Sequence, residues 1–319
     1  MSLLELALRK ARATTTAEDL PSGARTVGQH VLHSAFVPAW DFAEPADHNH
    51  GVERSAAVPA PRPGSVPVPS SEVHHAMRPL RAVDGGLEFL DFNPAYSDKL
   101  AMGEQSHPEI REQFRKIAAA LYRVRELRPV KVVMVVSAVP GEGKTLTAVN
   151  LALTLSESYK SQVLLVDADL RRPSVHRVFG LSNTAGLKER LVAEVDQLLP
   201  TAVSPYLAVL TAGTAPVDPM SALVSDRMRA VLGAGASTSD WVILDTPPVE
   251  LLPDAKLLAS FADVAILVVQ AGSTKCQLAQ RAIEAIGRDR IVGVVLNQVK
   301  EADSERHNYD GYYGDGNGQ

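Results

Sequence analysis

A glycine-rich octapeptide, AVPGEGKT, lies at residues 138–145 of this 319-residue chain and limits its possible folds more than any other segment. It directly follows KVVMVVS at 131–137, a β-branched and aliphatic run that predicts a strand buried on both faces. An amphipathic segment predicts a helix from 144 to 158. Gly141 and Gly143 allow the backbone to fold around an anion, and the start of the helix adds its positive end. The junction of strand and helix is therefore a predicted phosphate site.

The octapeptide matches the P-loop pattern, in which a small residue is followed by four residues and then by Gly-Lys-Thr. We expect Lys144 to reach the β- and γ-phosphates of a nucleotide and the Thr145 hydroxyl to ligate Mg²⁺. The residues predicted to surround the nucleotide are Ala138, Val139, Pro140, Gly141, Glu142, Gly143, Lys144, Thr145 and Leu146.

Strand-like and helix-like segments alternate through the rest of this region. Such alternation predicts an α/β fold with a mainly parallel sheet and helices on both faces. An earlier helix is predicted at 107–127, where Pro108 suits a first turn. The other predicted strands are 162–168, 207–211, 241–246, 264–270 and 291–297, and the other helices are 184–194, 221–234, 254–260 and 274–288.

Acidic residues end two of the predicted strands. Asp245 follows four apolar residues in VILDTPP, and Asp167 and Asp169 end the strand in VLLVDADLRRP. Because ligands of parallel α/β sheets lie at the carboxyl ends of the strands, these carboxylates should converge on the nucleotide. Asp245 then has the Walker B position that holds Mg²⁺. Residues two apart on an extended strand point the same way, so Asp167 and Asp169 are both expected to face the nucleotide.

The composition of the chain argues against several classes of function and location. The net charge of −5 argues against a general nucleic-acid binder. A single cysteine, Cys276, fits a reducing cytosol, and no apolar run approaches the ~20 residues of a membrane helix. We therefore expect a cytoplasmic protein. Six of the nine histidines lie between His30 and His75 without metal-ligand spacing, so no metal beyond Mg²⁺ is expected.

Four segments are predicted along the chain. Residues 1–13 form a short amphipathic helix, and residues 14–84 form a disordered linker rich in proline and histidine. Residues 85–300 form the P-loop domain, and residues 301–319 form a flexible tail that carries three tyrosines.

Over residues 108–319 the chain resembles the bacterial tyrosine kinases, the autokinases of capsule and exopolysaccharide production. The resemblance is carried by SAVPGEGKT, VLLVDADLRRPSVHRVFGL, DWVILDTPPVELLPDA, IVGVVLN and the tyrosine-rich tail. ParA- and MinD-type positioning ATPases carry a second lysine five residues before the P-loop lysine, and this chain has Val139 there. That valine argues against a positioning ATPase.

The resemblance implies an ATP- and Mg²⁺-dependent protein-tyrosine autokinase. In it, Asp167 would assist the tyrosine hydroxyl, while Asp169, Asp245 and Thr145 organise Mg²⁺ and Lys144 steadies the transferred phosphoryl group. The implied phosphate acceptors are Tyr309, Tyr312 and Tyr313 in the tail. Asn297, at the end of the last predicted strand, either contacts the adenine, as in family members, or caps a turn.

The resemblance also implies partners. These are a separate membrane-bound polysaccharide co-polymerase that activates the kinase, a cognate tyrosine phosphatase, and further copies of the chain. The activator would recruit the protein to the inner face of the plasma membrane. The family joins its subunits through Glu-x-x-Arg-x-x-Arg; here Glu112 and Arg115 match, but Ala118 takes the third position. The alternative function is a nucleotide-switched scaffold of the export machinery with little phosphotransfer.

Overall fold

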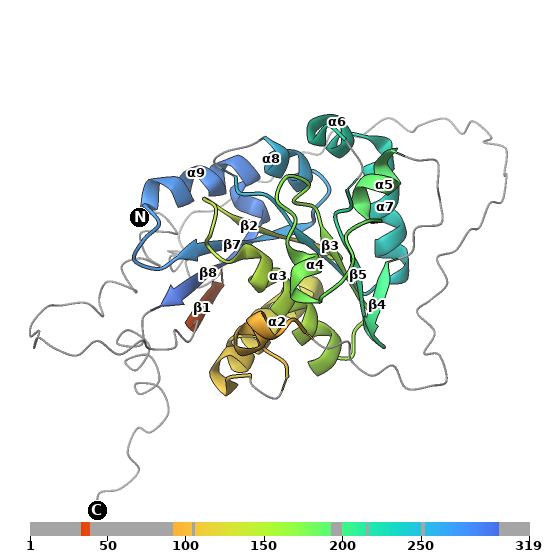
Figure 1. Cartoon of the computed structure of the whole chain (residues 1–319). Helices are drawn as coiled ribbons and strands as arrows, with labels where there is room; N and C mark the ends of the chain where they lie inside the picture. Colours follow the sequence, from red (N-terminus) through yellow and green to blue (C-terminus); the bar gives the residue numbers. More distant parts are fainter. Residues whose placement is uncertain are drawn as a thin grey trace, which may run out of the picture.

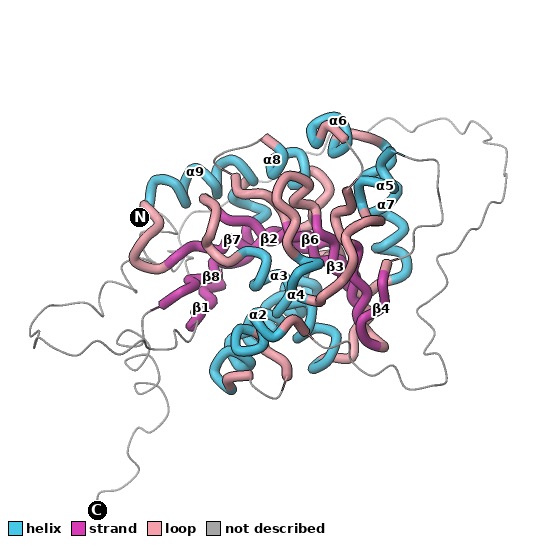
Figure 2. The backbone as a smooth tube through the Cα atoms, in the orientation of Figure 1, coloured by secondary structure: helices cyan, strands magenta, loops and turns pink. Residues whose placement is uncertain are grey.

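An eight-stranded sheet crosses the middle of the molecule, with helices on both of its faces (Figure 1, Figure 2). This arrangement confirms the predicted α/β class. The computed structural model describes residues 33–38, 92–103, 106–192, 200–214, 217–249 and 253–299.

The sheet is parallel in its interior and antiparallel at its two edges. Its strand order is β1-β8-β7-β2-β6-β3-β5-β4, and only the β1–β8 and β4–β5 pairs are antiparallel. The strands are β1 (His33–Pro38), β2 (Val132–Ser137), β3 (Val163–Asp167), β4 (Thr201–Ser204), β5 (Leu207–Leu210), β6 (Trp241–Asp245), β7 (Val264–Gln270) and β8 (Ile291–Val299).

The strands bury both of their faces, as their nearly continuous apolar sequences require. In β2, Val132, Met134 and Val136 pack into one core layer, and Val133 and Val135 pack into the other. Helices α2, α3 and α4 cover the second layer, and α5 to α9 cover the first.

The helices alternate with the strands along the chain. The α-helices are α2 (Pro108–Leu127), α3 (Lys144–Leu153), α4 (Val175–Val178), α5 (Leu187–Val192), α6 (Pro219–Leu223), α7 (Asp226–Thr238), α8 (Asp254–Ala259) and α9 (Cys276–Ile286). A π-helical turn, η3 (Thr154–Ser158), ends α3, and 3₁₀ turns lie at η2 (Pro94–Lys99) and η4 (Arg288–Arg290). In the described part of the chain no helix is both long and apolar enough to cross a membrane.

Two predicted elements differ from those observed. The helix expected at 221–234 is divided into α6 and α7, because the Ser225 hydroxyl caps the start of α7 by accepting the N–H of Met228. Within the expected disordered linker 14–84, residues 33–38 form β1, so the prediction of disorder is wrong for these residues. Its Pro38 is tolerated because β1 is an edge strand. The rest of 14–84 and the expected helix at 1–13 lie outside the described residues.

Candidate functional site

The phosphate loop joins the end of β2 to the start of α3, as predicted (Figure 1). Gly141 and Gly143 have positive φ angles of 88° and 91°, the left-handed region that glycine enters without cost. The first intrahelical hydrogen bond runs from the N–H of Thr147 to the carbonyl of Gly143, at 2.9 Å. The preceding N–H groups of α3 therefore have no acceptor one turn earlier and can bind an anion.

Three buried aspartates lie beside this loop at the carboxyl ends of adjacent strands. Asp167 of β3 and Asp245 of β6 are paired residues in the sheet, and Asp169 follows β3. Their exposed fractions are only 0%, 0% and 3%. The three carboxylates therefore lie at one edge of the sheet, and their convergence on a nucleotide stays a prediction.

Lys144, the first residue of α3, lies between two of these acids. Its Nζ donates a hydrogen bond to Asp169 Oδ2 at 3.1 Å and is 3.9 Å from Asp245 Oδ1. Burial disfavours the charged ammonium, but the negative charges of Asp245 and Asp169 outweigh it and raise the pKa of Lys144. The lysine thus stays charged and holds the acidic cluster together.

Thr145 links the helix to the end of β6. Its hydroxyl donates to Asp245 Oδ2 at 2.7 Å and accepts from the Ser174 hydroxyl at 3.0 Å. The other oxygen of Asp245, Oδ1, is buried and accepts no hydrogen bond from any described residue. Burial raises the pKa of Asp245 to about 6, while the nearby Lys144 charge and the Thr145 hydrogen bond lower it.

These donors fit a hard divalent cation. A buried Asp245 oxygen that accepts no hydrogen bond within the described part of the chain, the Thr145 hydroxyl and the carboxylate of Asp169 together provide the oxygen ligands that Mg²⁺ prefers. Mg²⁺ usually takes one or two carboxylates, with water and phosphate oxygens completing its octahedron. Thr145, Asp169 and Asp245 would hold it here.

Asp167 is oriented differently from the sequence expectation. Its Oδ2 accepts the N–H groups of Ser174 and Val175, both at 3.0 Å, at the start of α4, and its Oδ1 accepts the N–H of Asp169 at 3.3 Å. Asp169, in contrast, faces Lys144. The two side chains diverge because β3 ends at Asp167, so the alternation of an extended strand does not continue to Asp169.

The surroundings of Asp167 change its acidity. Burial, followed by the charge of Asp245, raises the pKa of Asp167 to about 8, although the N–H groups of Val175 and Ser174 pull it down. A carboxyl group with a pKa near neutral pH is suited to exchange a proton with a substrate.

Glu142 has a role that sequence reasoning missed. Its side chain is fully buried, and its carboxylate accepts the N–H of Val139 at 2.8 Å, the N–H of Gln270 at 3.2 Å and the hydroxyl of Thr274. The carboxylate thus fastens the loop to the end of β7 and the turn before α9. No sequence motif marked Gln270 or Thr274, because they lie far from the loop along the chain.

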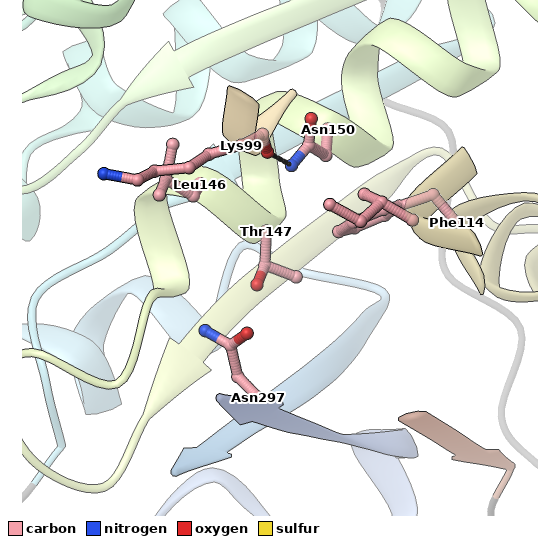
Figure 3. Close-up of a pocket in the computed structure, with 7 residues that line it drawn as sticks. Lys99, Phe114, Leu146, Thr147, Asn150 and Asn297 are labelled. Carbon is pink, nitrogen blue, oxygen red and sulfur yellow. Dashed lines mark hydrogen bonds between the residues drawn. The ribbon is translucent and has the colours of Figure 1, made fainter. Parts of the chain in front are cut away.

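Asn297, at the carboxyl end of β8, also contacts the loop. Its Nδ2 donates to the carbonyl of Glu142 at 2.8 Å. Figure 3 shows its side chain facing Thr147 of α3, beside a cavity of about 20 Å³ that Leu146 and Phe114 also line. The neighbouring Gln298 donates its Nε2 to the carbonyl of Gly141 at 3.2 Å, a contact that the sequence did not suggest.

The remaining predicted loop residues surround the same point. Ala138 is buried, Val139 is half-buried, and its carbonyl accepts the Ser137 hydroxyl at 2.9 Å. Pro140 is exposed at the tip of the loop. The predicted acceptors Tyr309, Tyr312 and Tyr313 lie outside the described residues.

Arg171 supports the loop that carries Asp169. Its guanidinium makes a two-pronged ion pair with Asp254 of α8, at 2.6 Å and 3.2 Å. Asp254 is almost fully buried. The pair ties the segment after β3 to the first turn of α8 and thereby holds the acidic cluster against the first core layer.

Comparison with known proteins places this geometry in a family context. Residues 133–314, more than half of the chain, match the model of the CobQ/CobB/MinD/ParA nucleotide binding domain. The chain is 38% identical over 207 residues to the tyrosine-protein kinase YwqD of Bacillus subtilis, covering 64% of this chain and 86% of that one.

Two solved structures are similar in fold. The kinase domain of Escherichia coli tyrosine kinase ETK aligns with a TM-score of 0.59 and 27% identity, over 69% of this chain and 84% of that one. The crystal structure of the chimerical protein CapA2B2 aligns with a TM-score of 0.58 and 29% identity, over 64% and 91% of the two chains.

Proposed function

This chain belongs to the bacterial tyrosine-protein kinases, and we propose that it is an autokinase that transfers the γ-phosphoryl group of ATP to tyrosines of its own C-terminal tail. The observation that carries the proposal is the Lys144 ammonium, held at the phosphate loop among the buried carboxylates of Asp169 and Asp245. The alternative of a nucleotide-switched scaffold is not favoured, because the relatives are named as kinases.

The residues of the site divide the work of phosphoryl transfer. The N–H groups of the loop and of the first turn of α3 bind the phosphates, and Lys144 exchanges its contact with Asp169 for the transferred phosphoryl oxygens. Thr145, Asp169 and Asp245 would hold Mg²⁺, which would supply positive charge against the phosphates. This positive charge is needed because the acidic cluster would otherwise repel ATP.

A tyrosine hydroxyl is a weak nucleophile at neutral pH, since its pKa is near 10. Its oxygen forms a bond to the γ-phosphorus as the bond to the β–γ bridging oxygen breaks, and its proton must be taken up. We assign Asp167 as the proton acceptor, because its carboxylate lies beside Asp245 at the carboxyl end of β3, and a hydrogen-bond network joins it to Thr145 through Ser174.

The acceptors are Tyr309, Tyr312 and Tyr313, three of the seven tyrosines of the chain. Tyr309 lies twelve residues beyond Asn297, and an extended segment of that length spans ~40 Å at ~3.3 Å per residue. This reach permits phosphorylation of a neighbouring subunit. Each phosphotyrosine adds roughly −1.5 to −2 charges at pH 7, which would loosen the contacts of an acidic tail.

In the cell, we propose that cycles of tail phosphorylation control exopolysaccharide or capsule polymerisation and export. The protein would be cytoplasmic and recruited to the inner face of the plasma membrane by a membrane-bound co-polymerase that activates it. A cognate tyrosine phosphatase would reset the tail, and a homo-oligomer would present tails in trans. In α2, Glu112 and Arg115 are exposed, and Glu112 Oε2 lies 3.9 Å from an Arg115 guanidinium nitrogen. Ala118 is buried, so its side chain cannot contact another subunit.

The deciding experiment measures the mass of the C-terminal peptide after incubation with ATP and Mg²⁺. We expect phosphate on Tyr309, Tyr312 or Tyr313 in the parent protein and none in Lys144→Met, because the methionine cannot carry the positive charge. An unmodified tail in a parent that binds ATP, even with the co-polymerase's cytoplasmic segment added, would contradict the autokinase.

A further inference from the structure

We propose that Asn297 and Gln298 are positioning residues of the phosphate site. Their side-chain amides hold two consecutive carbonyls of the loop, those of Glu142 and Gly141, turned away from the nucleotide. The inference rests on the proposed nucleotide site and adds residues that set its geometry. It also replaces the expected contact between Asn297 and the adenine.

The geometry of the peptide bond fixes where the N–H groups of the loop point. None of the described peptide bonds is cis, and in a trans peptide the C=O and the following N–H point in opposite directions. Asn297 Nδ2 binds the Glu142 carbonyl at 2.8 Å, and Gln298 Nε2 binds the Gly141 carbonyl at 3.2 Å. The N–H groups of Gly143 and Glu142 consequently point away from β8. These are two of the donors that a phosphate-binding loop requires.

The carboxylate of Glu142 fixes the same peptides from another direction. It is fully buried and accepts hydrogen bonds from Val139, Gln270 and Thr274, so the side chain of the residue between the two bound carbonyls is anchored as well. A buried carboxylate is stable only while such donors surround it. The loop is thereby held in its binding shape before any anion arrives, which reduces the ordering that binding requires.

The backbone of Gln298 explains how both amides reach one loop. Adjacent side chains of a regular strand point to opposite faces. Gln298, however, has a φ of 58°, a left-handed conformation that a non-glycine residue adopts rarely. The register between β1 and β8 also shifts here, since His33 pairs with Val299 but Ala35 pairs with Leu296. This irregularity breaks the alternation and lets both side chains face the loop. Strained backbone of this kind persists where the surrounding structure requires it, often at functional sites.

The surroundings of Asn297 favour this role over contact with the base. The residue is only 7% exposed, and its amide nitrogen donates to the Glu142 carbonyl. The adjoining cavity of about 20 Å³ accommodates a water molecule rather than a purine (Figure 3). A Cβ on Gly143 would lie 2.0 Å from Asn297 Nδ2, so the amide is seated directly against the loop.

The test distinguishes an effect on phosphate binding from an effect on adenine binding, because it compares ATP with inorganic tripolyphosphate, which has no base. Both ligands are titrated calorimetrically, with Mg²⁺, into the parent, Asn297→Ala and Gln298→Met, neither of which adds charge. We expect each variant to bind both ligands about 2- to 10-fold more weakly, and by the same factor for each, because the lost bond shapes only the phosphate loop. Gln277→Met, at an exposed position of α9, is the matched control and should bind as the parent does.

Other outcomes would overturn the proposal. If Asn297→Ala weakens ATP alone and leaves tripolyphosphate unchanged, Asn297 contacts the base instead. If both variants bind both ligands as the parent does, neither amide positions the loop. A merely structural role would lower the melting temperature without changing the affinity of the folded protein, so thermal unfolding is measured in parallel. A parent that binds neither ligand would refute the nucleotide site itself and, with it, the proposed function.

Discussion

At the scale of single residues, Gly143 is the point where backbone conformation and site geometry meet. Its φ of 91° belongs to the region that disfavours side chains, and a Cβ there would strike Asn297 Nδ2. The carbonyl of Gly143 also accepts the first hydrogen bond of α3, from the N–H of Thr147. Because glycine has no side chain, the loop, the start of α3 and the end of β8 can lie in contact at this position.

We predict that Gly143→Ala lowers ATP affinity at least tenfold and destabilises the protein by about 1–3 kcal/mol, because it combines backbone strain with displacement of Asn297. Calorimetric titration and chemical denaturation measure the two effects. The matched control is Gly233→Ala in α7, where a Cβ meets nothing within 4 Å. This control should leave ATP binding unchanged and stabilise the helix by about 0.5–1 kcal/mol. Equal affinities in parent and Gly143→Ala would contradict the prediction.

At the scale of elements, β8 connects several parts of the site. It pairs with β7 in parallel and with β1 in antiparallel orientation, and its last residues support the phosphate loop. The strand also directly precedes, in sequence, the tail that carries the tyrosines. Because β1 covers the outer edge of β8, a segment from the N-terminal region pairs with the strand whose last residues contact the phosphate loop.

We predict that a chain starting at residue 85 is less stable than the full chain, because β8 loses its edge partner. A loss of several degrees in melting temperature is expected, since 1 kcal/mol corresponds to about 2–4 °C in a domain of this size. Thermal unfolding measures it.

The control is a chain starting at residue 29, which removes sequence from the same end but retains β1. It should melt within about 1 °C of the full chain. If the chain starting at residue 85 has the same melting temperature as this control, β1 contributes nothing to stability. The same pair of chains tests the predicted start of the P-loop domain at residue 85.

At the scale of the whole molecule, burial of the acidic cluster lowers the free energy of unfolding of the nucleotide-free protein. Desolvation raises the pKa of Asp167 to about 8 and that of Asp245 to about 6, with opposing contributions from the N–H groups and from Lys144. In the unfolded chain both carboxyls titrate near the ordinary value of 3.8. Between these values the folded state binds more protons, so its stability falls as the pH rises.

We therefore predict that the nucleotide-free protein loses stability from these groups between about pH 4 and pH 8. Asp245→Asn removes one of the two charges, so its stability relative to the parent should increase as the pH rises from about 4 to about 6. Urea unfolding at successive pH values measures the difference, in which contributions common to both proteins cancel. A difference that stays constant or shrinks over this interval would show that Asp245 is not destabilised by burial.

Much of the fold and part of the site could be predicted from local sequence. The P-loop octapeptide, the apolar strands and the terminal aspartates each follow from rules that operate within a few residues, and the structure brings them together as expected. The division into α6 and α7 was missed because the Ser225 cap lies inside an otherwise helical pattern. Strand β1 was missed because an isolated six-residue edge strand gives no signal beside so many prolines.

The candidate reactive groups can be listed from the amino-acid sequence: a lysine and a threonine at a glycine-rich loop, carboxylates at strand ends, and tyrosines near the C-terminus. How the groups at the loop are held depends on packing between segments that are distant in the chain. The Glu142 carboxylate accepts hydrogen bonds from Gln270 and Thr274. Asn297 and Gln298 donate hydrogen bonds to the loop, and all of these partners are more than a hundred residues apart in the chain. Such contacts arise because the parallel sheet places the ends of β2, β7 and β8 side by side, and no local pattern records which strands become neighbours.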